Sequence, residues 1–158
     1  SKELIQLQIY GAALDASSKE AIERLNMHSV VVSHGRIEND PVTGESGRER
    51  IMRFMRSSDV LLALHGKDEW CAEYIPSKLY DYYWTNRPIF AITHRNPQLD
   101  AILMARGAYM SHTSDVDSIV NAIRWIWSDW QSKNLRTMPF SPISPQSAVE
   151  EILTKISS

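Results

Sequence analysis

Two acidic residues, Glu73 and Asp81, flank a short segment whose residue types suit a phosphorylated sugar. Glu73 ends a loop, and Asp81 falls about one turn inside the helix that we predict to follow. A carboxylate can accept hydrogen bonds from two neighbouring sugar hydroxyls, as acidic residues do with ribose in nucleotide sites. Acids are 19 of the 158 residues, so this spacing alone is common by chance. The interpretation therefore depends on the residues between and around the two acids.

The helix predicted after Glu73, Pro76–Trp84, begins with residues suited to binding an anion. Its first turn leaves backbone N–H groups near Ser77 and Lys78 without helical partners, and the helix dipole favours negative charge there. Pro76 suits the first helical position, and Lys78 adds a positive charge towards a phosphate. Ser and Lys at a helix start also serve capping and solubility, so a purely structural role is the alternative.

These residues must be positioned by a chain that alternates short apolar runs with helical patterns. Apolar strands separated by helices predict a parallel sheet that is covered on both faces. Right-handed crossovers then give an α/β fold, a Rossmann-like doubly wound sheet with helices on both faces. The predicted strands are Leu4–Tyr10, Ser29–Ser33, Val60–His65, Pro88–Thr93 and Ala108–His112. The predicted helices are Ser17–Met27, Ser46–Ser57, Pro76–Trp84, Gln98–Arg106 and Asp115–Ser132.

The length of 158 residues predicts one domain with an ordinary globular composition. Its parts are a βα core over residues 1–136, a Pro-bearing connector over 137–145 and a C-terminal amphipathic helix over 146–158. The chain begins at Ser1 and enters an apolar run at once, so we interpret it as part of a longer protein. Trp125 and Trp127 lie off the apolar stripe of their helix. We expect them to cover the sheet edge or the C-terminal segment, the alternative being contact with a missing domain.

Composition and missing motifs exclude several classes of function. A net charge of −2 gives no electrostatic case for nucleic acid as a partner. Cys71 is the only cysteine, which excludes a disulfide framework and indicates a reducing, cytoplasmic compartment. Only Gly11 follows the first strand, so the glycine-rich dinucleotide fingerprint of a dehydrogenase is absent. The five histidines lack metal-ligand spacing, and no apolar run is long enough to span a bilayer.

The stretch from His65 to Ile92 is the most specific part of the sequence. It contains Ala72–Tyr82 and Asn86–Ile92, and the strand-like run Ser58–Gly66 leads into it. Together these stretches resemble the C-terminal half of GT-B-fold glycosyltransferases, over roughly residues 4–132. The similarity is closest to the bacterial surface-polysaccharide type, related to the retaining glycosyltransferase family 4.

That half carries two Glu residues separated by seven positions, with a proline seven residues after the second. Glu73, Asp81 and Pro88 have this spacing, with Asp in place of the second Glu. Tyr74 and Pro76 stand where glycines are common between the acids, and Pro76 has no N–H. We interpret this variant as a subtype of the family.

The resemblance implies a role for each matched residue. Glu73, the residue closest to catalysis, would contact hydroxyls of the donor sugar, and Asp81 would hold the ribose. The backbone of Tyr74–Lys78 would meet the diphosphate and the donor sugar. The loop His34–Ile37 would lie near the base, and Gly11 near the phosphates or the base. The implied donor-binding residues are Asp81, Tyr74, Ile75, Ser77, Lys78, Gly11, Arg36, Ile37, His65 and Gly66.

The implied activity is transfer of a sugar from a nucleotide-diphosphate sugar to a glycan or glycolipid acceptor, with no metal or other cofactor. The acceptor would bind to a missing N-terminal half of the same chain, which is also the part expected to contact a membrane surface. This fragment alone would be inactive. The alternatives are a nucleotide-sugar epimerase of the same fold, or a non-catalytic α/β module that binds a partner. A receiver-like module needs acids that the ends of the first and third strands do not supply.

Overall fold

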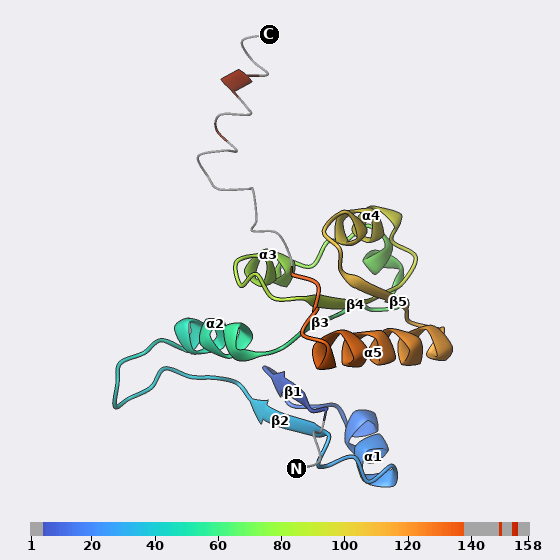
Figure 1. Ribbon diagram of the computed structural model, residues 1–158. Helices are drawn as coiled ribbons and strands as arrows, with labels where there is room; N and C mark the ends of the chain where they lie inside the picture. The colour runs from blue at the N-terminus through green and yellow to red at the C-terminus, as the bar shows by residue number, and fades with distance from the viewer. Residues whose placement is uncertain (1–4, 138–148, 150–152, 155–158) are drawn as a thin grey trace. The chain divides into compact units, whose positions relative to one another are not determined.

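The computed structural model describes residues 5–137, 149, 153 and 154 (Figure 1). The chain divides into two compact units, residues up to Phe54 and residues from Met55 onward, and each is described by itself. The elements in order are β1 (Leu7–Tyr10), α1 (Ala16–Arg24), β2 (Val31–Gly35), α2 (Gly47–Ser57), β3 (Leu61–Leu64), the 3₁₀ turn η1 (Glu69–Ala72), α3 (Lys78–Tyr83), β4 (Ile89–Thr93), α4 (Pro97–Ala105), β5 (Tyr109–His112) and α5 (Val116–Gln131).

The first unit is built on the parallel pair β1–β2, in which Leu7 lies opposite Val31. Asp15 starts α1, because its carboxylate accepts from the Ser18 N–H at 2.8 Å. The helix thus begins with a side-chain cap for an N–H group that has no helical partner. Hydrogen bonds from Ser17 and Ser18 hold the pKa of the Asp15 carboxyl well below its ordinary value.

A structured loop joins β2 to α2 in the same unit. Asp40 closes its turn by accepting from the backbone N–H groups of Val42 and Thr43, at 2.8 and 3.1 Å. These bonds lower the pKa of the Asp40 carboxyl. The helix α2 then starts with a reciprocal cap, because the Glu49 carboxylate accepts from the Ser46 N–H at 2.8 Å and the Ser46 hydroxyl accepts from the Glu49 N–H at 3.2 Å. The loop is therefore fixed by its own polar residues.

The second unit has a three-stranded parallel sheet in the order β3–β4–β5, with helices on both faces (Figure 1). All five residues of the central strand β4 are buried, and its alternate side chains enter two separate cores. Ile89 and Ala91 pack with residues of α3 and α4. Phe90 and Ile92 pack with residues of α5. This continuous burial explains why the strand is apolar throughout.

The predicted order of strands and helices is confirmed along the described chain, with ends that differ by a few residues. The hydrogen-bonded strands fall into a pair and a triplet, so the structure shows an α/β chain with two small parallel sheets. A single doubly wound sheet of all five strands stays a prediction. The predicted connector and C-terminal helix lie outside the described residues, except for Thr137, Val149, Leu153 and Thr154. None of the described helices has the length and apolar character needed to cross a bilayer.

Candidate functional site

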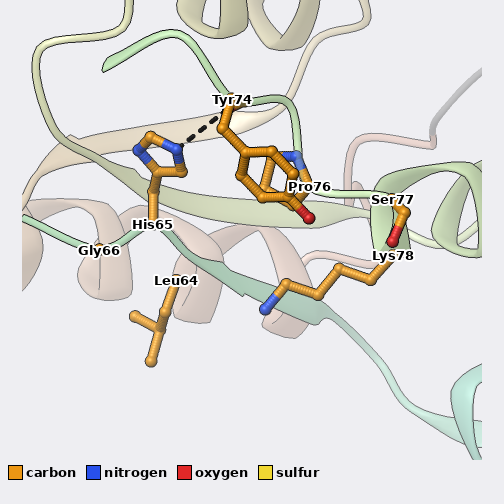
Figure 2. Close-up of a pocket in the computed structure, with 7 residues that line it drawn as sticks. All are labelled: Leu64, His65, Gly66, Tyr74, Pro76, Ser77 and Lys78. Atoms are coloured by element: carbon orange, nitrogen blue, oxygen red, sulfur yellow. Dashed lines mark hydrogen bonds between the residues drawn. The ribbon is translucent and has the colours of Figure 1, made fainter. Parts of the chain in front are cut away.

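A hollow of about 280 Å³ opens beside the carboxyl end of β3 (Figure 2). The strand ends at Leu64, the chain leaves through η1, and it returns at Tyr74 to enter α3. This is the edge at which parallel sheets bind ligands. The hollow, called the β3 hollow below, is lined by Leu64, His65, Gly66, Tyr74, Pro76, Ser77 and Lys78. Five of the predicted donor-binding residues are thus brought together: His65, Gly66, Tyr74, Ser77 and Lys78.

The helix α3 begins at Lys78, so the prediction that it begins with Pro76 is wrong. Pro76 and Ser77 instead form a tight turn, in which their carbonyls accept from the N–H groups of Leu79 and Tyr80 at 3.0 and 3.1 Å. A helix signal in the sequence cannot separate such a turn from the first helical residues. The Ser77 hydroxyl makes no capping hydrogen bond. The structural alternative of a Ser77 cap therefore has no support in the local geometry.

The lining of the β3 hollow suits an anion that carries hydroxyl groups. Lys78 supplies a positively charged side chain, which extends back from α3 towards Leu64 (Figure 2). Ser77 adds a hydroxyl, and the exposed Tyr74 ring forms one wall. No aspartate or glutamate is among the lining residues of this hollow. A phosphate would therefore meet positive charge and hydrogen-bond donors without a competing carboxylate.

The Tyr74 carbonyl fixes the wall of the hollow, because two buried side chains donate to it. His65 Nε2 lies 3.2 Å from this oxygen, and Asn96 Nδ2 lies 3.0 Å from it. Asn96 also caps α4 by accepting from the Leu99 N–H at 2.9 Å. Sequence analysis missed Asn96 as a site residue. Its place directly before Pro97 predicts a helix cap, but nothing in the sequence indicates that its amide reaches Tyr74.

The remaining predicted residues of the second unit lie outside the lining. Glu73 is exposed beside Tyr74, and Ile75 is half-buried and packs against the core of α3 and α4. Asp81 is half-buried on α3. Burial, with a smaller contribution from the Asp81 carboxylate, raises the pKa of the neighbouring Tyr82. The Tyr82 hydroxyl donates to the Leu62 carbonyl at 3.1 Å and so ties α3 to β3.

Gly11, Arg36 and Ile37 belong to the first unit, which is described apart from the β3 hollow. Gly11 has a φ of 127°, a conformation that favours glycine, and its N–H donates to the Gly35 carbonyl at 2.9 Å. Arg36 pairs with Glu38 at 3.3 Å in an exposed ion pair. The strand β2 continues to Gly35, so the predicted loop from His34 to Ile37 begins only at Arg36.

An aromatic stack at the end of β1 and β2 was not predicted. The Tyr10 ring stacks on His34 with ring centres 4.6 Å apart and on Phe54 with centres 5.0 Å apart. The Gln8 side chain hydrogen-bonds to His34 Nε2. The three rings come from distant positions in the sequence, so no local pattern could have shown that they meet. The stack fixes the His34 side chain at the end of its strand.

A second hollow, of about 310 Å³, lies beside the start of β5. Trp125 and Arg136 line it, and Trp125 is exposed, whereas Trp127 stacks on Trp130 at 5.2 Å.

In the part of the chain that the structure describes, no three His, Cys, Asp or Glu side chains group closely enough to hold a metal ion. The chain matches no protein-family model, no curated protein and no solved structure.

Proposed function

We propose that this chain is the donor-binding half of a GT-B glycosyltransferase, which transfers a sugar from a nucleotide-diphosphate sugar to a glycan or glycolipid acceptor. The observation that carries the proposal is the β3 hollow at the carboxyl end of a parallel strand. Its lining includes five residues that the resemblance associates with donor binding. Both lines of reasoning, from residue type and from position in the fold, thus lead to one site.

The charges of the β3 hollow support a role in holding the diphosphate. Lys78 would attract the phosphate charge, and the Ser77 hydroxyl would donate to a phosphate oxygen. During transfer the diphosphate leaves with the bonding electron pair, so its negative charge grows in the transition state. Positive charge that is already in place stabilises that state more than the ground state. A protein cation can supply this stabilisation where no metal takes part.

The proposal assigns the hydroxyl groups of the donor to the two acids. Glu73 lies next to the wall of the hollow and is exposed, so it is accessible to the transferred sugar. Asp81 would hold the ribose, and the residues of the first unit would contact the base. All five strands would then form one doubly wound sheet, with the acceptor bound by another part of a longer cytoplasmic protein.

The test is an NMR titration of the chain with UDP, GDP and ADP, and with UDP-glucose, GDP-mannose and ADP-glucose. We expect shifts of the amides of His65, Gly66 and Tyr74–Lys78, with one base preferred over the other two. Inorganic pyrophosphate should shift the Ser77 and Lys78 amides and leave those of Arg36 and Ile37 in place. Millimolar ligand that moves none of these amides would contradict the proposed site.

A further inference from the structure

Two buried side chains hold the backbone of the β3 hollow from two different elements. His65, directly after β3, is 6% exposed, and Asn96, directly before α4, is 1% exposed. Both donate to one oxygen, the Tyr74 carbonyl, at 3.2 and 3.0 Å. We call this carbonyl with its two donors the Tyr74 anchor. Two donors on one carbonyl oxygen satisfy both of its lone pairs.

Both donors are themselves fixed by the sheet and by a helix. The His65 N–H donates to the Ile92 carbonyl of β4 at 2.9 Å. Asn96 is held by its cap to Leu99 and by an Asp100 N–H that donates to its carbonyl at 3.0 Å. Donors on rigid elements set a geometry more closely than donors on loops. The Tyr74 anchor therefore fixes the position of the segment after η1 relative to β3 and α4.

The Tyr74 side chain does not hold its own backbone, because it is 52% exposed. Pro76 is buried and Ile75 is half-buried, and their packing keeps the segment against the core. Apolar packing has little directional preference, so it does not set the rotation of a peptide plane. Hydrogen bonds are directional, and the plane of the Tyr74 peptide is rigid. The two donors thus fix the direction in which the chain continues to Ser77 and Lys78.

We propose that His65 and Asn96 are positioning residues that set the geometry of Ser77 and Lys78 in the β3 hollow through the Tyr74 carbonyl. The inference rests on the proposed donor-binding function for its effect on a ligand, but the anchor itself can be tested without one. A carbonyl oxygen can only accept, so Nε2 of His65 carries a hydrogen in this contact. Nδ1 is buried and has no partner among the described residues.

The substitution Asn96→Asp separates the two jobs of this side chain. A carboxylate still accepts from the Leu99 N–H and keeps the cap of α4, but it cannot donate to the Tyr74 carbonyl. We expect the amides of Leu79 and Tyr80, which bond to the turn after the anchor, to exchange hydrogen about tenfold faster, which corresponds to about 1.4 kcal/mol. The Leu99 amide should be unchanged. If the Leu79 and Tyr80 amides exchange at the same rate in Asn96→Asp as in the wild type, the proposal is overturned.

A second pair of variants tests the His65 side of the anchor. His65→Phe removes the donor and keeps a ring, whereas His65→Gln retains an N–H that can reach the carbonyl. We expect faster exchange at Leu79 and Tyr80 in the first variant and near-normal exchange in the second. Nitrogen NMR of the wild-type ring should show hydrogen on Nε2. Hydrogen on Nδ1 instead would overturn the assignment of His65 as a donor.

A UDP titration then tests the consequence for the ligand. Asn121→Asp is the matched control, because Asn121 is exposed on α5, is not part of the anchor, and its replacement adds the same single negative charge. We expect weaker UDP binding by about tenfold in Asn96→Asp and unchanged binding in the control. Equal affinity in wild type and Asn96→Asp, with exchange altered, would overturn the positioning role. A wild type that binds none of UDP, GDP and ADP would refute the proposed function, and the exchange result would still decide whether the anchor holds the segment.

Discussion

Replacing Lys78 by glutamine gives the most direct prediction about the β3 hollow. The ammonium group is exposed, and the ion pairs found among the described residues do not involve it. Two unit charges about 4 Å apart interact by about 1 kcal/mol in water and about 4 kcal/mol near a protein surface. Because the side chain is solvated, we take about 1–2 kcal/mol for its contact with a diphosphate. The dissociation constant of UDP should therefore rise by about 5- to 30-fold.

The assay is a calorimetric titration of wild type and variant with UDP at low and at high salt. Lys67→Gln is the matched control, since Lys67 is also exposed and follows Gly66 but does not line the hollow. Both variants lower the net charge by one, so a general charge effect would appear equally in both. The difference between them should shrink at high salt, because screening weakens contacts between exposed charges. Equal losses in the two variants, or none in either, would refute the placement of the phosphate.

Three further predictions concern the fold. Tyr109→Phe removes a buried hydroxyl that donates to Asp129 at 2.6 Å. Denaturant unfolding should show that the free energy of unfolding falls by about 1.5–3 kcal/mol. A fall of less than about 0.5 kcal/mol would contradict this bond. Gly47→Ala places a Cβ against the Ile37 carbonyl oxygen and should cost about 1–3 kcal/mol in the same assay, whereas unchanged stability would mean that the loop moves freely. The lowered pKa of Asp15 means that its ionised cap stabilises α1 fully above the ordinary value of 3.8, and that this stabilisation is lost progressively as the pH falls from 3.8 through the lowered pKa of the folded chain. The amide chemical shifts of α1, followed by NMR during acidification, should therefore change less in Asp15→Asn than in the wild type. Equal changes in the two proteins would count against the cap.

The order of elements could be predicted because each strand and helix has a local signal. The run around Ile89–Thr93 is apolar throughout, and the structure buries all five residues between two helical layers. The helix predicted over Gln98–Arg106 corresponds to α4, and the helix predicted over Asp115–Ser132 corresponds to α5. These signals depend on a few neighbouring residues, which a sequence displays directly.

The parts that could not be predicted depend on residues far apart in the chain. The bond from Asn96 to Tyr74 spans 22 positions, and the stack of Tyr10 on His34 joins two strands. The late start of α3 depends on how Pro76 and Ser77 turn, and the 3₁₀ turn η1 has no periodic pattern long enough to detect. The rule that ligands bind at the carboxyl ends of parallel strands predicted where the residues of the β3 hollow meet. It did not predict that His65 and Asn96 hold the Tyr74 carbonyl.

The complete burial of β4 has a consequence for the chain before it folds. A run of five apolar or β-branched residues without charge can associate with the same run in another unfolded molecule. Arg87 and Pro88 precede the run, and His94 and Arg95 follow it. Charges and proline at these positions interrupt strand-to-strand stacking between molecules, in the manner of gatekeeper residues. We therefore expect the residues that border the central strand to limit aggregation of the unfolded chain, whereas the helices cover the strand once the chain has folded.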